Sequence, residues 1–360
     1  MNICFVIGTL NYSGAEKIMF HLIKEMTRRG HEVSVILIAS DKETSGLDGV
    51  KQYPIFRAEE DREGRIKRAL VRQRIIRKIV KENNFDIVVS FGTMFNVDVA
   101  EACLLLPVKL ILCERNDPIY DPKTRFKRLR RRISYNRGDG FVFQTQEICS
   151  FFPKRIQKKS VIIPNFMDTK ISKDRMYAPK NKTITTSCRI DNYQKDLTTL
   201  FEAFKYFHRE YPEYVLELYG DGPDMSAMKK YTEQIGISGS VRFMGRVDDP
   251  MGYIRHSTMF VLSSNYEGMP NALIEAMAYG MPCIASDCSG GGARALIKHK
   301  ENGLLFTVGD YQQLKNYMCQ IANDKEFANK IGRNARQINN DLSVEKIIPL
   351  WEEFLYELKK

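Results

Sequence analysis

The sequence lacks the cysteine and histidine patterns of a structural metal site. Its eight cysteines include no CxxC pair, and its five histidines include no HxxH pair and no Cys/His cluster. A chain of 360 residues also needs no disulfides to stabilise its cores. We therefore expect reduced cysteines, a cytoplasmic location and no bound metal. The cysteines are residues 4, 103, 113, 149, 188, 283, 288 and 319.

Long apolar runs are also missing. The segment 102–113, ACLLLPVKLILC, is interrupted by Pro107 and Lys109. It is also shorter than the roughly 20 residues that a membrane-spanning helix needs. The segment 1–10, MNICFVIGTL, has neither a basic leader nor a cleavage site and is typical of a first strand. We expect no transmembrane segment.

What the chain does contain is two successive series of short apolar strands. Its composition, with 43% hydrophobic and 28% charged residues, is that of a folded protein long enough for two domains. Nearly continuous apolar strands separated by helical patterns predict parallel sheets covered on both faces. We expect two doubly wound, Rossmann-like α/β domains at 1–165 and 166–340, whose strand-to-helix loops face a cleft, and a helix in 341–360. The expected strands lie in NICFVIGTL, HEVSVILIA, FDIVVSF, VKLILCE and GFVFQTQ, then in TITTSCRI, VLELYGDG, VRFMGRV, MFVLSSN and MPCIASD.

Positive charge is concentrated in two segments of the first half. The net charge is +11, and residues 62–81 hold nine Lys and Arg against one Glu, whereas residues 123–137 hold eight against none. In the second segment Phe126, Leu129 and Ile133 recur at helical spacing, which predicts an amphipathic basic helix. Such helices suit an anionic membrane surface, and ordinary solvated surface helices are the alternative. Nucleic-acid binding is disfavoured, because stacking aromatic residues are not interleaved with the arginines.

Two strand-to-helix loops contain residues suited to a phosphate group. After the first strand, a turn at Gly14 begins a helix whose backbone N–H groups can approach an anion. In the second half, Arg189 ends a strand and Lys195 enters a helix, so two cations flank one loop and can clamp a diphosphate. Taken alone, these residues indicate only a helix start and two surface cations.

A third loop places two acids around an apolar helix. In EGMPNALIEAMAYG, residues 267–280, Glu267 precedes the helix and Glu275 lies about one turn inside it. A buried carboxylate needs a partner, and its two oxygens match two vicinal hydroxyls such as those of a ribose. Pairing of Glu275 with a basic neighbour is the alternative. The free N–H groups at 271–273 are suited to a phosphate.

These motifs together resemble the family-4 retaining glycosyltransferases of the GT-B fold. The resemblance rests on Arg189 and Lys195, on YGDG and VRFMG, and above all on EGMPNALIEAMAYGMP, in which seven residues separate Glu267 from Glu275. It implies that a sugar moves from a nucleotide diphosphate sugar with retention of configuration and without a metal. It also implies that the helix in 341–360 crosses back to pack on the first domain.

The resemblance also implies a role for each matching residue. Arg189 and Lys195 would hold the donor diphosphate and stabilise the leaving nucleotide. Glu267 would orient the transferred sugar rather than attack it, and Glu275 would bind the ribose. The implied catalytic residues are Glu267, Arg189 and Lys195. The implied donor-binding residues are Gly14, Arg189, Lys195, Met244, Glu267, Gly268, Met269, Pro270, Asn271, Ala272, Leu273 and Glu275.

The chain departs from the family pattern at three places. Cys188 replaces the glycine often found before the arginine, and residues 289–297, SGGGARALI, lack an acid often found there, so that we expect no ligand contact from them. Where the family often has a histidine that contacts the sugar, the chain has CERNDP. We expect a contact with the sugar or the acceptor from one of Glu114, Arg115 and Asn116.

The motifs YEGMPNALIEAMA and CERNDP resemble members that build bacterial capsule, exopolysaccharide or lipid-linked glycans. The resemblance implies a hexosyl- or N-acetylhexosaminyltransferase that uses a UDP-sugar and a polyprenyl-diphosphate-linked acceptor. A soluble acceptor or a GDP-sugar donor is the alternative. Because both basic segments fall in the acceptor domain, we expect peripheral binding to the inner face of the cell membrane. The expected membrane-surface residues are Arg65, Lys67, Arg68, Arg72, Lys127, Arg128, Arg130, Arg131 and Arg132.

Overall fold

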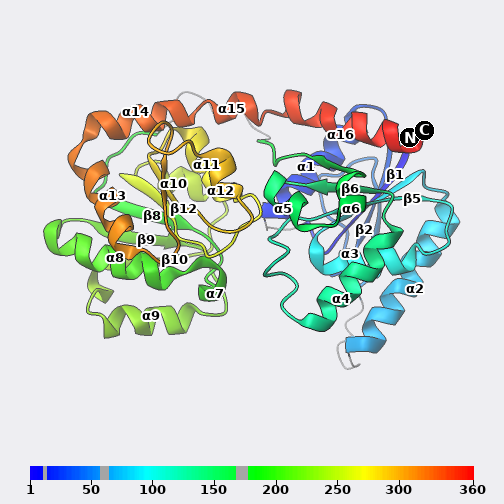
Figure 1. Ribbon diagram of the computed structural model, residues 1–360, viewed down its shortest axis with the longest axis horizontal. Helices are drawn as coiled ribbons and strands as arrows, with labels where there is room; N and C mark the ends of the chain where they lie inside the picture. The colour runs from blue at the N-terminus through cyan, green and yellow to red at the C-terminus, as the bar shows by residue number, and fades with distance from the viewer. Residues whose placement is uncertain (11–13, 57–64, 168–176) are drawn as a thin grey trace. The chain divides into compact units, whose positions relative to one another are not determined.

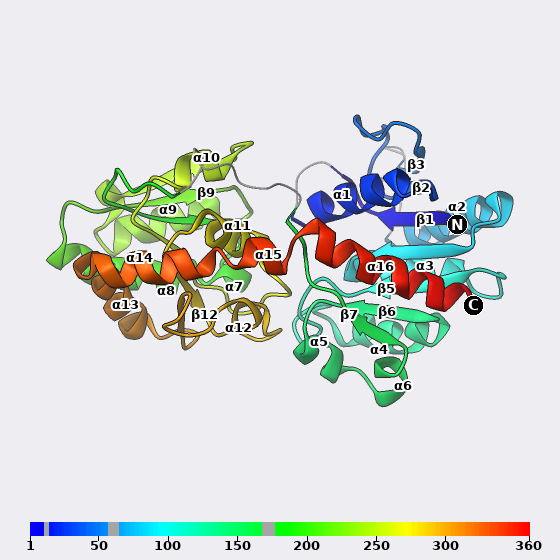
Figure 2. The same cartoon turned by 90° about the horizontal axis from the view of Figure 1, so that it is seen from above.

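The computed structural model describes residues 1–10, 14–56, 65–167 and 177–360. The chain divides into two compact units: unit 1 comprises Met1–Phe166 and Val344–Lys360, and unit 2 comprises Met167–Ser343. Each unit is a parallel sheet with helices on both faces (Figures 1 and 2). The expectation of two Rossmann-like α/β domains is confirmed.

The sheet of unit 1 has seven strands in the order β3-β2-β1-β4-β5-β6-β7. The interiors of β1, β2, β4, β5 and β6 are mostly apolar and buried on both faces, as a covered parallel sheet requires. The sequence did not indicate β3 or β7, because both are short and only partly buried. The strands are β1 (Asn2–Ile7), β2 (Glu32–Leu37), β3 (Lys51–Pro54), β4 (Ile87–Phe91), β5 (Lys109–Cys113), β6 (Gly140–Phe143) and β7 (Ser160–Ile162).

Helices cover the two faces of this sheet unequally (Figure 1). One face packs against α2, α3, α5 and α6, whose Ile76, Val99, Ile148 and Ile156 join one apolar core with the strands. Helix α4 lies outside α3, and α1 and α16 cover the other face. The helices are α1 (Gly14–Arg28), α2 (Arg65–Asn83), α3 (Thr93–Ala102), α4 (Arg125–Ser134), η2 (Tyr135–Arg137), α5 (Gln146–Phe151), α6 (Lys154–Gln157) and α16 (Val344–Lys359).

Helix α16 packs on unit 1, as the resemblance implied. Trp351 is 1% exposed, and its ring centroid lies 6.3 Å from that of Phe91 in β4. Glu352 accepts a hydrogen bond of 2.6 Å from Arg29. Apolar burial, supplemented by a charged contact at the edge, therefore holds this helix against the sheet.

The sheet of unit 2 has six strands in the order β10-β9-β8-β11-β12-β13. Its core includes three phenylalanines of α8, Phe201, Phe204 and Phe207, all fully buried. The strands are β8 (Thr183–Ser187), β9 (Val215–Tyr219), β10 (Val241–Gly245), β11 (Met259–Leu262), β12 (Cys283–Ser286) and β13 (Leu304–Phe306). The helices are α7 (Asn192–Lys195), α8 (Leu197–Glu210), α9 (Met225–Gln234), η4 (Ser238–Ser240), α10 (Pro250–Ile254), α11 (Asn271–Tyr279), α12 (Gly292–Leu296), α13 (Tyr311–Asn323), α14 (Lys325–Ala335) and α15 (Ile338–Asp341).

Candidate active site

The predicted catalytic residues lie on two loops that leave neighbouring strands of unit 2. Strands β8 and β11 are paired, and the strand order reverses between them. In open α/β sheets, ligands bind beyond the carboxyl ends of the strands at such a reversal. Arg189 lies in the loop after β8, Lys195 ends the short helix α7 that follows this loop, and Glu267 lies in the loop after β11.

Lys195 and Glu267 form a buried ion pair. Lys195 Nζ lies 2.5 Å from Glu267 Oε1, and their side chains are 14% and 8% exposed. Ser264 Oγ donates a second hydrogen bond of 2.6 Å to the same carboxylate oxygen. Burial is the largest single effect and lowers the pKa of Lys195, but the charge and hydrogen bond of Glu267, together with Cys188 and Cys288, raise the pKa above its usual value.

Backbone contacts between the two loops fix the position of Lys195. Ser263 Oγ donates to the carbonyl of Lys195 at 2.8 Å, and the Asn265 N–H donates to the carbonyl of Gln194 at 2.7 Å. Asp196 follows with a left-handed backbone, and its side chain accepts from the Thr199 N–H as the N-cap of α8. The backbone at Lys195 is therefore held between the loop that follows β11 and the start of α8.

Arg189 is exposed, and its guanidinium makes no hydrogen bond or ion pair within the described ranges. Strand β8 ends at Ser187 rather than at Arg189, which lies in the following loop. The YGDG turn supports this loop at close range: a Cβ on Gly220 would collide with the Cys188 carbonyl, and Gly220 has φ +134°. The glycine is required there both by its backbone conformation and by the close approach.

The backbone after Glu267 leads into α11. Pro270 is the N-cap and provides no side-chain acceptor for the first N–H groups. The expectation that the N–H groups of 271–273 are all free is wrong for Leu273, which donates to the Pro270 carbonyl at 3.2 Å. Glu275 lies in α11 and is partly buried, and Met244 in β10 is 43% exposed. The other donor-binding assignments, including Gly14 at the start of α1, stay predictions.

Residues 289–292 support the Glu267 loop, although we expected no ligand contact from them. The Glu267 N–H donates to the Ser289 carbonyl at 3.1 Å. A Cβ on Gly292 would collide with the Gly268 carbonyl. The run of three glycines was the sequence signal for this close approach of two backbones.

In unit 1, Glu114 is enclosed rather than available to a ligand. It is 0% exposed, and it accepts hydrogen bonds from Thr93 Oγ1 at 2.6 Å and from the Tyr135 hydroxyl. Burial raises the pKa of Glu114 to about 7, against the opposing effects of Arg131 and of these hydrogen bonds. The expectation that Glu114 is a candidate contact is therefore wrong for this arrangement, because its carboxylate is already occupied and has no surface.

Arg115 and Asn116 both keep some accessible surface. The Arg115 guanidinium lies 4.2 Å from the ring centroid of Phe91 and donates to the Asn165 side chain. Its Nε and Nη1 are enclosed without a partner in the described part of the chain, and burial lowers the pKa of Arg115 to about 10. A guanidinium with two unpartnered nitrogens is suited to a further acceptor.

Comparisons with known proteins identify the family. Residues 12–171 match the model of Glycosyltransferase Family 4, and residues 168–338 match the model of Glycosyl transferases group 1. The chain belongs to glycosyltransferase family 4.

Relatives of this glycosyltransferase cover its whole length. It is 24% identical to an uncharacterized glycosyltransferase of Haemophilus influenzae over 98% of each chain. It is 25% identical to a Campylobacter jejuni enzyme over 100% of this chain and 99% of that one. That enzyme is named GalNAc-alpha-(1->4)-GalNAc-alpha-(1->3)-diNAcBac-PP-undecaprenol alpha-1,4-N-acetyl-D-galactosaminyltransferase. The chain also superposes on a crystal structure of Anabaena Alr3699/HepE in complex with UDP and glucose, with a TM-score of 0.81 and 20% sequence identity over 99% of each chain. This similarity shows that the two proteins share the GT-B fold.

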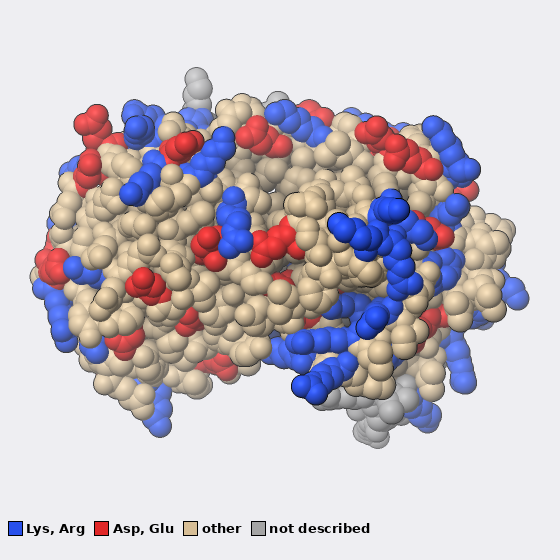
Figure 3. Space-filling model, viewed as in Figure 1, with Lys and Arg blue, Asp and Glu red and all other residues tan. Residues whose placement is uncertain are grey.

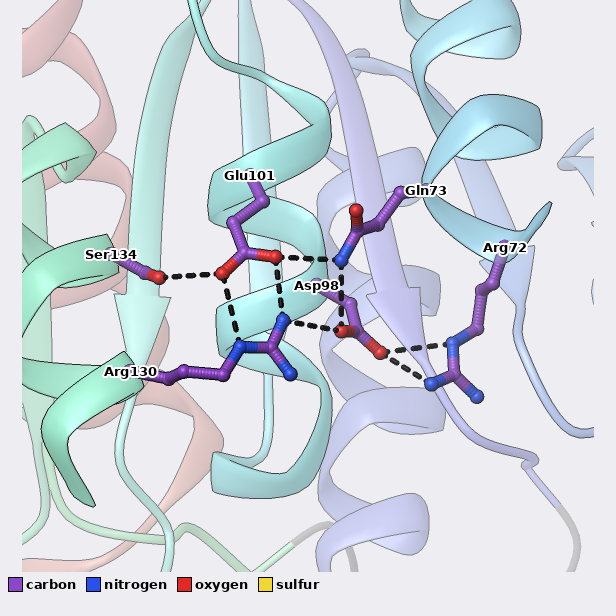
Figure 4. Close-up of polar contacts among 6 residues, drawn as sticks. All are labelled: Arg72, Gln73, Asp98, Glu101, Arg130 and Ser134. Atoms are coloured by element: carbon purple, nitrogen blue, oxygen red, sulfur yellow. Dashed lines mark hydrogen bonds and ion pairs between the residues drawn. The ribbon is translucent and has the colours of Figure 1, made fainter. Parts of the chain in front are cut away.

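Several of the arginines expected at the membrane surface of the glycosyltransferase instead make contacts within unit 1 (Figure 4). Arg72 of α2 donates to Asp98 at 3.0 Å through Nε, and Arg130 of α4 lies 2.6 Å from Glu101. Arg131 is 4% exposed, so its assignment to the surface is wrong. Among the others, the side chain of Arg65 lies outside the described part, Arg68 is partly buried, and the exposed ones are Lys67, Lys127, Arg128 and Arg132.

Two kinds of feature are absent from the described residues, a helix able to cross a membrane and a cluster of metal ligands. No helix there has both the length and the hydrophobicity to cross a bilayer. No group of three His, Cys, Asp or Glu in the same ranges is arranged to hold a metal ion.

Proposed function

We propose that this glycosyltransferase moves a hexose or an N-acetylhexosamine from a UDP-sugar to a polyprenyl-diphosphate-linked saccharide, with retention of configuration and without a metal. The observation that carries the proposal is the buried Lys195–Glu267 pair, next to the exposed Arg189, at the reversal of strand order. Two cations and one acid at this place suit the cleavage of a bond between a sugar and a diphosphate.

Arg189 and Lys195 would stabilise the leaving nucleotide. When the bond between the anomeric carbon and the diphosphate oxygen breaks, negative charge develops on that oxygen, and a fixed cation nearby lowers the barrier. Arg189 has free N–H groups for a bidentate contact with phosphate, and Lys195 acts as a point charge. These two side chains would supply the charge stabilisation that a metal provides in other enzymes.

Glu267 would orient the sugar rather than form a bond to it. Its Oε1 already accepts hydrogen bonds from Lys195 and Ser264, which reduces its strength as a nucleophile. Its carboxylate is instead suited to sugar hydroxyls. In this proposal the acceptor hydroxyl attacks the face that the diphosphate leaves, and its proton passes to the departing oxygen, so that configuration is retained.

The names of the relatives support the substrate classes. The Campylobacter enzyme is named for an undecaprenol-linked acceptor, and the Anabaena structure contains UDP. A lipid-linked acceptor requires the enzyme to work at a membrane surface, and we therefore propose that it binds the inner face of the cell membrane peripherally.

The test is a nucleotide-release assay with separate donor and acceptor arms. UDP-sugars and GDP-sugars are compared, each with a short polyprenyl diphosphate saccharide, with the same saccharide lacking lipid, and with EDTA. We expect UDP release that depends on the lipid-linked acceptor, persists in EDTA and gives a product with the donor's anomeric configuration by NMR. Release with GDP-sugars only, or with the lipid-free saccharide only, would favour the corresponding alternative.

Single substitutions test whether the proposed residues carry out the reaction. Arg189→Ala should lower turnover by about 100-fold or more. Arg209→Ala, at the far end of α8 and also exposed, should leave it unchanged. Undiminished release by Arg189→Ala, or a covalent sugar trapped on Glu267, would overturn the proposed mechanism.

A further inference from the structure

Helix α4 turns its apolar face toward solvent. Phe126, Leu129 and Ile133 lie on one side of the helix and are 69%, 54% and 61% exposed. Arg131, on the opposite side, is 4% exposed. A surface helix of a globular protein normally has the reverse arrangement, with its apolar stripe against the core.

The contacts on the inner face of α4 prevent the helix from rotating about its axis. Arg131 donates to the carbonyls of Pro118 at 2.9 Å and Asp121 at 2.7 Å. Ser134 donates to Glu101 at 3.0 Å, beside the Arg130 ion pair (Figure 4). Burying the apolar stripe would break these charged contacts, which are costly to lose. These contacts within unit 1 therefore keep the apolar stripe exposed.

Helices α5 and α6 extend this surface. The Arg131 guanidinium lies 5.3 Å from the ring centroid of Phe151 in α5, which places α5 next to the inner side of α4. Phe151 is itself 46% exposed. Helix α6, which follows, exposes two cations that the sequence pattern did not indicate, Lys154 and Arg155. Lys158 and Lys159 come after this helix and line a groove with Glu353 and Glu357 of α16, so they are not part of the surface.

Charge over this region is almost entirely of one sign. Residues 123–159 contain twelve Lys and Arg against two acids, Asp139 and Glu147. Figure 3 shows Lys and Arg gathered over the part of unit 1 that carries α4 and α6. Exposed apolar side chains thus lie among a large excess of cations.

We infer that the α4–α6 surface is a membrane-docking face that takes an anionic lipid bilayer. This surface is defined by the apolar side chains of Phe126, Leu129, Ile133 and Phe151 and by the exposed cations of α4 and α6. The apolar side chains enter the boundary between headgroups and acyl chains, while the cations pair with lipid phosphates. A planar anionic surface matches both properties at once, whereas a protein partner would need a strongly acidic and apolar face.

This inference deepens the proposed function, which it uses only as the reason why the enzyme meets a bilayer. From the sequence we expected cations at the membrane surface. In this inference the insertion of apolar side chains, and not charge alone, holds the protein on the bilayer. Binding that rests on charge disappears at high salt, because ions screen it. Binding through the apolar stripe persists in part.

The first experiment measures sedimentation with vesicles of phosphatidylglycerol and phosphatidylethanolamine, and with vesicles of phosphatidylcholine alone. We expect binding to the anionic vesicles, part of which survives high salt. The triple variant Phe126→Ser, Leu129→Ser and Ile133→Ser should lower the partition coefficient by about 100-fold or more, from the loss of three apolar contacts. Tyr356→Ser, on α16 at the other face of the sheet and 50% exposed, is the matched control and should bind as the wild type does.

A second variant reports insertion directly. The chain contains one tryptophan, Trp351, which is buried. The fluorescence of Phe126→Trp should shift to the blue with anionic vesicles and be quenched by brominated lipid, and that of Tyr356→Trp should not change. These experiments need no turnover, so an inactive protein that binds vesicles would contradict the proposed function but not this inference.

Two results would overturn the inference. One is wild-type binding by a triple variant whose circular dichroism and melting temperature are unchanged, together with no blue shift of Phe126→Trp. The other is a wild-type dimer that the triple variant converts to a monomer without any change in vesicle binding, because the occupant would then be a second copy of the chain.

Discussion

The ion pair between Lys195 and Glu267 should hold the two donor loops together as well as take part in the reaction. Both side chains are nearly enclosed at 2.5 Å separation, so replacing one partner leaves an uncompensated charge. We expect Lys195→Met alone, or Glu267→Gln alone, to lower the free energy of unfolding of unit 2 by about 3 kcal/mol. The matched control is Lys230→Met on exposed α9, which should cost less than about 0.5 kcal/mol.

Combining the two substitutions removes both charges, so the double variant should be more stable than the sum of the single effects indicates. The expected coupling energy in this double-mutant cycle is about 2 kcal/mol. Urea unfolding followed by circular dichroism reports both units, while the fluorescence of Trp351 reports unit 1 and identifies which transition moves.

Turnover should behave differently from stability in the same variants. The proposed chemistry needs the Lys195 charge at the leaving group, so nucleotide release should fall by about 1000-fold in Lys195→Met and stay low in the stabilised double variant. Additive stability effects would refute the structural part of the reasoning. Normal turnover in Lys195→Met would refute the catalytic part.

Two further predictions concern the supports of the sites. Gly292→Ala should lower the free energy of unfolding of unit 2 by about 2 kcal/mol or more and raise the KM for the donor, because the new Cβ collides with the Gly268 carbonyl. The control is Gly239→Ala, whose new Cβ meets no atom within 4 Å and which should change neither quantity. The pKa of Glu114 is raised from 4.5 to about 7 in the folded protein. Its contribution to the free energy of unfolding is therefore fully present below about pH 4.5 and is lost as the pH rises through about 7. The loss amounts to about 3 kcal/mol in all. Urea unfolding followed by Trp351 fluorescence should show this loss in the wild type and not in Glu114→Gln, and equal pH profiles would contradict the assignment.

Most of the fold could be predicted because most of its strands lie in short apolar or β-branched runs that are separated by helical patterns. Ten strand segments were expected, and each contains a strand of the structure. The three that the sequence missed, β3, β7 and β13, have three or four residues each. Three residues, as in β7 and β13, are too few for a pattern to show. Strand β3 (KQYP) has no apolar run, whereas β6, β11 and β12 are equally short but mostly apolar.

The candidate donor site could be predicted only in part. The spacing of Glu267 and Glu275 and the positions of Arg189 and Lys195 follow from motifs in continuous sequence. The hydrogen bond from Ser264 and the support from residues 289–292 depend on contacts between different loops, which spacing does not reveal.

The orientation of α4 shows the same limit in unit 1. Periodicity identified the apolar stripe correctly, but it cannot say which side of a helix meets the protein. That depends on the acids of α3 and the carbonyls that Arg131 reaches.

The connections between the two units have a consequence for engineering. Met167 pairs with Ser343 in a parallel bridge, and its N–H donates to the Leu342 carbonyl at 2.7 Å. The chain therefore enters and leaves unit 2 at neighbouring points, as in a domain inserted into a host, and a single proteolytic cut at one connection would leave the other intact. A deletion that joins Phe166 to Val344 through a short linker would yield the host alone, with its sheet, α16 and Trp351 complete. Such a minimal protein would carry the α4–α6 surface without any donor loop, so lipid binding and sugar transfer could be separated by design.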